Sequence, residues 1–215
     1  MKININSLNQ KSITIYRLIV CLLGWTNLIL LMVFTNEITE NGRIYRLYAF
    51  QANFLAILWL TISLIFYKKD EKPKILHLGV NGAVTSYNTI ALLTYIIFLA
   101  PRDSNAVGIH FFTSLTVHII IPIAVFIDWL LTSNKIKYKW VYSLYWAIYP
   151  ICYIIFCLIS GIIFNDPIYP FFDVNLLSIG GVAIAILGLT IFFIILASLY
   201  IFMNRRLYDT FYLNQ

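Results

Sequence analysis

The sequence predicts an all-α integral membrane protein, a polytopic bundle of six transmembrane helices that forms one domain over residues 1–215. Of the 215 residues, 61% are hydrophobic and only 11% are charged, whereas roughly one quarter of the residues in a soluble domain are charged. The hydrophobic residues fall into six long runs, each close to the ~20 residues that cross a bilayer as a helix. These runs lack the alternation of barrel strands, so helices are the structure that satisfies their backbone in lipid.

Each of the six predicted spans is bounded by polar or turn-forming residues. The first run follows basic residues, is longer than the core of a signal peptide and has no small-residue cleavage site after it, so we expect an uncleaved span. The charged connections YKKDEKPK and TSNKIKYK follow the second and fourth runs, and the turn-rich stretch NDPIYPFFD follows the fifth. The predicted spans cover residues 13–34, 46–67, 76–100, 109–132, 141–163 and 176–202.

The basic residues predict how the spans are oriented. Of the 15 Lys and Arg residues, only Arg43, Arg46 and Arg102 lie in connections on one side of the predicted membrane. Because cytoplasmic connections carry the excess of Lys and Arg, we expect both termini in the cytoplasm and the protein in the plasma (inner) membrane. The basic residues form no single patch, so the net charge of +6 does not indicate binding of nucleic acid.

The cysteines and histidines indicate neither a disulfide framework nor a metal centre. All three cysteines lie within apolar runs (Cys21, Cys152 and Cys157). The three histidines fall at an inner end, at an outer boundary and within a span (His77, His110 and His118), so they do not converge as metal ligands would. The sequence also lacks a Gly-rich phosphate loop, a G-x-S-x-G elbow and an H-E-x-x-H pair, and we expect no cofactor.

The fourth run, HFFTSLTVHIIIPIAVFIDWLL at residues 110–131, carries three residues that are unusual in a membrane helix. His118 lies well inside the run, and a histidine can act as an acid, a base or a ligand near physiological pH. Pro122 lies four residues further along and allows a kink beside the histidine. Asp128 lies near the inner end of the span, where we expect a structural ion pair or a cap.

Polar residues of the first three spans lie at the depth of His118, about 10 Å below the outer boundary. They would lose hydrogen bonds in lipid, so we expect them to face one another in an interior pocket. There His118 is the candidate base, and the candidate binding residues are Asn27, Gln51, Asn53, Thr94, Tyr95 and Ser114. The alternative is that these amides and hydroxyls only join helices through hydrogen bonds.

Four segments together resemble one protein family: YAFQANFLAILWL (48–60), VHIIIPIAVFIDWLL (117–131), LYWAIYPICYIIFCLISG (144–161) and YPFFDV (169–174). The motifs H-x-x-x-P, D-W, W-x-x-Y-P and Y-P-F-x-D occur in this order, and the chain is similar in them to the Pr-six-Pr family of bacterial six-span membrane proteins. The resemblance covers the second to sixth spans. It implies structural roles for Pro122, Asp128, Trp129, Tyr169, Pro170 and Asp173.

That family is distantly similar to the androgen-induced membrane proteins, which hydrolyse fatty acid esters of hydroxy fatty acids with an intramembrane threonine and histidine. The resemblance places the histidine at His118 and the threonine at Ala49, which has no hydroxyl. A covalent step needs a hydroxyl beside a base, so the resemblance implies a pocket that keeps its base and has lost its nucleophile. A hydrolase would need Ser114 or Thr94 as the nucleophile, or water activated by His118.

Three functions follow as hypotheses. The first is a non-catalytic protein that binds or presents a membrane lipid or fatty acyl ligand, which explains the missing hydroxyl. The second is an intramembrane lipid ester hydrolase with His118 as its base. The third is a small-molecule transporter, although a transporter would favour broken helices in repeated halves and the sequence shows no such repeat. The oligomeric state is left open.

Overall fold

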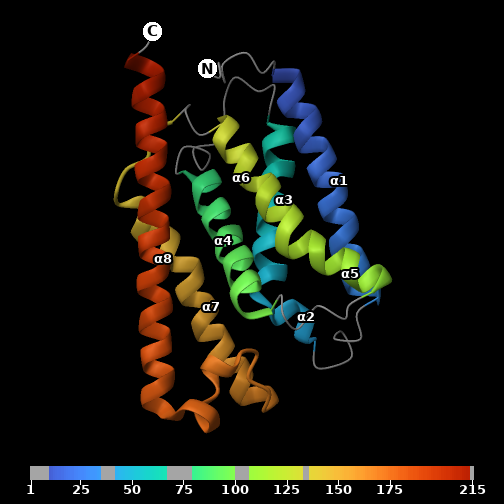
Figure 1. Ribbon diagram of the computed structural model, residues 1–215, viewed down its shortest axis with the longest axis vertical. Coiled ribbons are helices and arrows are strands. Elements are labelled where there is room, and N and C mark those ends of the chain that lie inside the picture. Colours follow the sequence, from blue (N-terminus) through green and yellow to red (C-terminus); the bar gives the residue numbers. More distant parts are fainter. Residues whose placement is uncertain (1–9, 35–41, 67–78, 100–106, 133–135, 214–215) are drawn as a thin grey trace.

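A computed structural model describes residues 10–34, 42–66, 79–99, 107–132 and 136–213, and these residues form helices joined by short connections, with no strand. The predicted all-α class is therefore confirmed for this part of the chain. The first residues of α1 and the last residues of α8 lie at one end of the molecule, and α2 and α5 lie at the other (Figure 1).

The helices are mostly long, and two of them contain a π-helical segment. The α-helices are α1 (Gln10–Phe34), α2 (Arg43–Arg46), α3 (Tyr48–Ile65), α4 (Val80–Thr94), α5 (Gly108–Leu115), α6 (Ile121–Thr132), α7 (Tyr142–Phe164) and α8 (Val174–Leu213). The two π-helical segments are η4 (Tyr95–Leu99), which continues α4, and η6 (Thr116–Ile120), which joins α5 to α6. A 3-10 turn, η8 (Pro170–Phe172), precedes α8.

Five helices are long and apolar enough to cross a membrane, as an integral membrane protein requires. They are Lys11–Phe34, Tyr48–Ile65, Gly108–Thr132, Tyr142–Phe164 and Val174–Thr210, and they contain most of the first, second, fourth, fifth and sixth predicted spans. The last helix differs most from its prediction: it continues beyond residue 202, and its backbone is broken at Ser178, where φ is 61°.

The third predicted span, 76–100, contains α4 and η4, and residues 76–78 and 100 lie outside the described part of the chain. This segment is not among the five apolar helices, because α4 has only 15 residues and many of them are polar. Its polar side chains are covered by protein: Thr85, Ser86 and Asn88 are fully buried where α4 contacts α3, α6 and α8. A helix in this central position need not be apolar, because its neighbours shield it.

Close packing between α4 and α7 depends on a glycine. A Cβ atom at Gly82 would lie 2.5 Å from the ring of Trp146 and 2.7 Å from the ring of Tyr138, which is far inside van der Waals contact. Glycine therefore allows these aromatic rings to lie against the backbone of α4.

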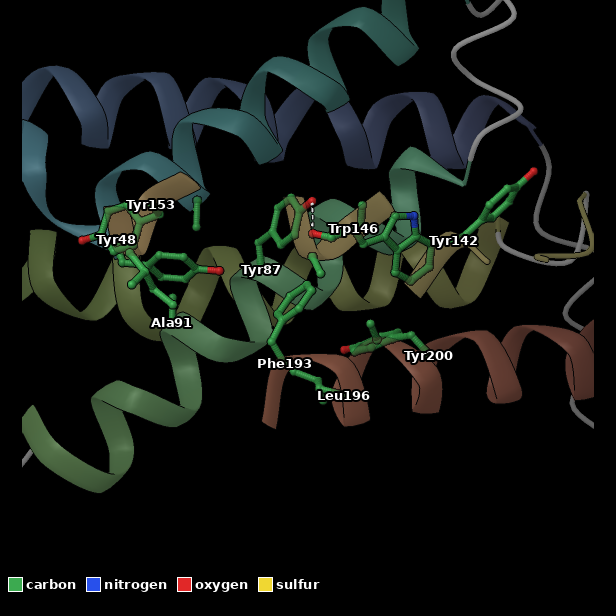
Figure 2. Packing of buried hydrophobic residues seen from close by; sticks show 14 of the residues in the cluster. Tyr48, Tyr87, Ala91, Tyr142, Trp146, Tyr153, Phe193, Leu196 and Tyr200 are labelled. Carbon is green, nitrogen blue, oxygen red and sulfur yellow. Dashed lines mark hydrogen bonds between the residues drawn. The ribbon is translucent and has the colours of Figure 1, made fainter. Parts of the chain in front are cut away.

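An aromatic cluster fills the space between α3, α4, α7 and α8 (Figure 2). Tyr48 and Tyr153 lie at one end of it, and Phe193 contributes from α8. The hydroxyl of Tyr87 donates a hydrogen bond of 2.9 Å to the backbone oxygen of Trp146, so a buried polar group is satisfied inside the cluster. The cluster packs the pair α7 and α8 against the rest of the bundle.

A buried ion pair joins α1 to α6. It lies toward the end of the molecule where α1 begins and α8 ends. Nε of Arg17 lies 2.6 Å from Oδ1 of Asp128, and a second bond of 3.0 Å joins Nη2 to Oδ2. The Asp128 side chain is fully buried, and the next residue, Trp129, is buried as well. Two parallel bonds between a guanidinium and a carboxylate give the pair a defined geometry.

We expect Asp128→Asn to lower the free energy of unfolding by about 3 kcal/mol, because it leaves the guanidinium of Arg17 without its charged partner. The measurement is unfolding of the purified protein in detergent micelles. Asp209→Asn is the matched control, since Asp209 pairs with Lys137 at the surface and its loss should cost less than about 1 kcal/mol. Equal losses in the two variants would contradict this role of Asp128.

Candidate functional site

A cavity of about 680 Å³ lies at the end of the bundle where α2 and α5 are found. Apolar side chains make up most of its walls, which come from α1, α2, α3, α4, α5, η6, α7, the connection through η8, and α8. The polar side chains on its wall are few: Arg43, Thr94, His110, Thr113, Ser114, His118, Asp173 and Thr190, together with Tyr48, Tyr153 and Tyr169. A largely apolar cavity with a few polar groups is typical of a small-molecule site.

The structure brings together part of the predicted site. His118, Thr94 and Ser114 all line the cavity, and so does Ala49, the position at which the family resemblance places a threonine. Tyr95 does not line it, but its ring stacks on that of His118. Candidate base, candidate hydroxyls and the position without a hydroxyl therefore face one common space.

His118 is held by an aromatic stack. It lies in η6, Tyr95 lies in η4, and their ring centroids are 4.3 Å apart with only 5° between the ring planes. Both residues thus belong to π-helical segments, which insert an additional residue in a helical turn and occur frequently at functional sites. The turn containing His118 ends immediately before Ile121 and Pro122, both of which are buried, so the π-helical residues lie beside the proline at which the sequence allowed a kink.

The side chains of Asn27, Gln51 and Asn53, which were predicted to bind a ligand, do not line the cavity. Their amide nitrogens donate hydrogen bonds to backbone oxygens. The amide nitrogen of Asn53 donates hydrogen bonds of 2.8 Å to the oxygens of Ala49 and Val117, and that of Asn27 donates one of 3.4 Å to the oxygen of Thr113. Gln51 binds the oxygen of Tyr45 at 2.9 Å. Asn27 and Asn53 therefore join α1 and α3 to the helix that carries His118, which is the role of helix-linking residues.

A short connection after α7 covers one side of the cavity. Residues 167–173 all line it, including Tyr169, Pro170 and Asp173, for which the sequence indicated structural roles. The backbone N–H of Tyr48 donates a hydrogen bond of 3.1 Å to the hydroxyl of Tyr169, and the ring of Tyr169 stacks on Phe171. Asp173 accepts a hydrogen bond of 2.9 Å from the backbone N–H of Asn175 at the start of α8. These contacts fix the connection against α3 and α8.

The same connection is tied to α2 by two ion pairs that were not predicted as part of the site. Oδ1 of Asp166 lies 2.6 Å from Nη1 of Arg43, and Oδ2 lies 2.6 Å from Nη2 of Arg46. The sequence held a signal for this cluster, because Arg43 and Arg46 are two of the three basic residues on the side of the predicted membrane that is otherwise poor in them.

The arginines also affect the ionisation of Asp166. Burial raises the pKa of its carboxyl, but hydrogen bonds and charge from Arg46 and Arg43 outweigh burial, so the pKa lies below its ordinary value. The carboxylate is therefore ionised throughout the physiological range. Within the described ranges, no group of three metal-ligating side chains gathers at the cavity or elsewhere.

Comparisons with protein-family models, with curated proteins and with solved structures found no match to this chain.

The depressed pKa of Asp166 predicts a loss of stability in acid. A carboxyl whose pKa is lower in the folded state stabilises that state at pH values above its unfolded pKa of about 4, and the stabilisation is lost as the pH falls through the folded pKa. We expect the melting temperature in detergent to fall below about pH 4, and the fall to be smaller in Asp166→Asn. An identical acid dependence in both proteins would show that this carboxyl does not contribute.

Proposed function

We propose that this chain is a six-span membrane protein that binds a lipid acyl chain in the cavity beside His118, without catalysing a reaction. The observation that carries the proposal is the cavity itself: its volume of about 680 Å³ falls within the usual range of small-molecule sites, and most of its wall is apolar. A flexible hydrocarbon chain matches such a wall, since burying apolar surface is the main favourable term it offers.

We place the cavity in the outer half of the membrane, as part of this proposal. The positive-inside rule puts both termini in the cytoplasm, and the cavity lies at the opposite end of the bundle from the start of α1 and the end of α8 (Figure 1). The segment α4 with η4 would be the third span in chain order and would bring the five apolar helices to six spans, with α3, α6 and α8 shielding it from lipid. Six spans are also what the resemblance to the Pr-six-Pr family implies.

The groups around His118 favour binding over catalysis. Ala49 contributes no hydroxyl, and the amides of Asn53 and Asn27 are occupied with backbone oxygens rather than aimed at a ligand. A covalent mechanism needs a nucleophile beside the base and donors for the developing negative charge. The cavity keeps the base but lacks the hydroxyl at position 49, and the remaining candidate hydroxyls, Thr94 and Ser114, belong to α4 and α5 rather than to α3.

Binding of tritiated oleyl alcohol to the detergent-purified protein tests the proposal. We expect saturable binding to the wild type and at least about tenfold weaker binding to Ala49→Phe, because the added ring fills part of the cavity. Ala183→Phe is the control, since Ala183 is exposed on α8 and the added ring lies outside the cavity.

Equal weakening in both variants, or no saturable binding to the wild type, would contradict an acyl site in this cavity. The melting temperature of each variant, measured in the same detergent, separates a blocked cavity from an unfolded bundle.

The second candidate function is a lipid ester hydrolase, favoured by one observation: Ala49 and His118 line the same cavity. If the remaining machinery is in place, Ala49→Thr should gain cleavage of branched fatty acid esters, and the double variant with His118→Ala should lose it again. Product release measured by mass spectrometry checks this. Turnover by the wild type that His118→Ala abolishes would replace the non-catalytic proposal, whereas background turnover in every variant would exclude the hydrolase for these esters.

A further inference from the structure

The three charged residues at the α2 end of the cavity do not balance. Arg43 and Arg46 share the single carboxylate of Asp166, so the cluster carries a net charge of +1. Arg46 is only 4% exposed, its guanidinium lies 4.7 Å from the ring centroid of Phe164, and among the described residues it forms an ion pair with no carboxylate other than that of Asp166. A net charge held in partly apolar surroundings is costly unless an anion compensates it.

Some N–H donors of Arg43 and Arg46 form no hydrogen bond with Asp166. In the part of the chain that the structure describes, Nε of Arg46 is buried without a hydrogen-bond partner, and the described hydrogen bonds of Arg43 consist of one bond from Nη1 to Asp166. A guanidinium has five N–H donors in a fixed planar arrangement. Arg43 also lines the cavity and is partly exposed, so its remaining donors can reach a ligand there.

The wall of the cavity also carries one carboxylate, whose negative charge would repel an anionic ligand. Asp173 lines the same cavity, but it accepts the backbone N–H of Asn175 and so acts as a cap at the start of α8. His110 and His118 line the cavity as well and add donors rather than negative charge. Asp173 therefore offsets the +1 of the arginine cluster over the cavity as a whole, but among the described residues it forms no ion pair with either arginine, so positive charge stays local to Arg43.

We propose that the acyl ligand carries an anionic headgroup, a carboxylate or a phosphate monoester, and that Arg43 binds this headgroup while the hydrocarbon chain lies along the apolar wall. Arginine is suited to both groups, because its planar donors match two oxygens of a carboxylate or a phosphate. Arg46 is a positioning residue here: it holds Asp166 and contributes charge without lining the cavity. The inference rests on the proposed acyl site and adds the chemistry of its ligand.

Competition against tritiated oleyl alcohol tests the headgroup separately from the chain. The competitors are oleate, oleoyl lysophosphatidate and unlabelled oleyl alcohol, which share a hydrocarbon chain and differ in their headgroups. We expect the wild type to bind at least one of the two anions about tenfold or more tightly than the alcohol, as a charge-assisted hydrogen bond provides. A preference for oleate identifies the carboxylate, and a preference for lysophosphatidate identifies the phosphate.

Three variants then assign the preference. Arg43→Gln should abolish it by lowering the affinity for the anion far more than the affinity for oleyl alcohol, because only the anion is bound through the charge of Arg43. Arg43→Lys should retain part of the preference, because lysine keeps the charge and loses the planar donors. Asp166→Asn should strengthen anion binding, since it raises the net charge of the cluster from +1 to +2. This opposite sign distinguishes headgroup binding from a merely structural role. Arg206→Gln is the control, because Arg206 is exposed in the last turns of α8 and does not line the cavity.

The outcomes separate this inference from the proposed function. Equal affinities for the anions and the alcohol in the wild type, or a preference that survives Arg43→Gln, would overturn the headgroup site and leave the acyl cavity standing. A wild type that binds none of the three lipids saturably would overturn both.

Discussion

A polar group inside a membrane helix must find its hydrogen-bond partner within the protein, and the arrangement of this bundle follows from that requirement. Three buried asparagines, Asn27, Asn53 and Asn88, each donate to a backbone oxygen of a neighbouring helix. Asn27 and Asn53 both reach the helix that carries His118, and Asn88 links α4 to α3. These amides fix the central helices relative to one another, and the irregular turn at His118 is held between them.

The cavity is a consequence of how that turn is placed. Because Asn53 binds the oxygen of Val117, the π-helical turn of η6 is anchored on one side, and the stack on Tyr95 anchors it on another. The cavity is then closed by the connection from Asp166 to Asp173, which crosses from α7 to α8. The site is thus assembled from a rigid polar framework and a separate covering segment, and the arginines of α2 hold the two together.

Run length and composition were sufficient to predict the class of fold, because hydrocarbon permits few alternatives. The similar depth of His118, Thr94 and Ser114 predicted a common pocket, and in the structure all three line the cavity. For Asn27 and Asn53 the sequence left two readings open, a pocket or hydrogen bonds between helices, and the structure shows hydrogen bonds between helices. Depth alone does not decide between them, because it fixes how far a residue lies from the surface and not which way it points around its helix. The π-helical segments and the folding of residues 166–173 over the cavity were not predictable, since both depend on contacts between residues far apart in the chain. The sequence analysis expected an ion pair or a cap at Asp128 and the structure shows an ion pair, but the partner, Arg17, lies 111 positions away and was not identified.

The most direct test of the central claim, an acyl chain inside the bundle beside His118, is photo-crosslinking with an oleoyl probe that carries a diazirine in the middle of its chain. The account predicts labelling of cavity-lining residues such as Val117, Ile154 and Leu189, and loss of this labelling when unlabelled oleate and oleyl alcohol are added in excess. Labelling confined to exposed residues of α7 and α8, such as Ile159 and Leu187, and unchanged by excess lipid, would contradict it.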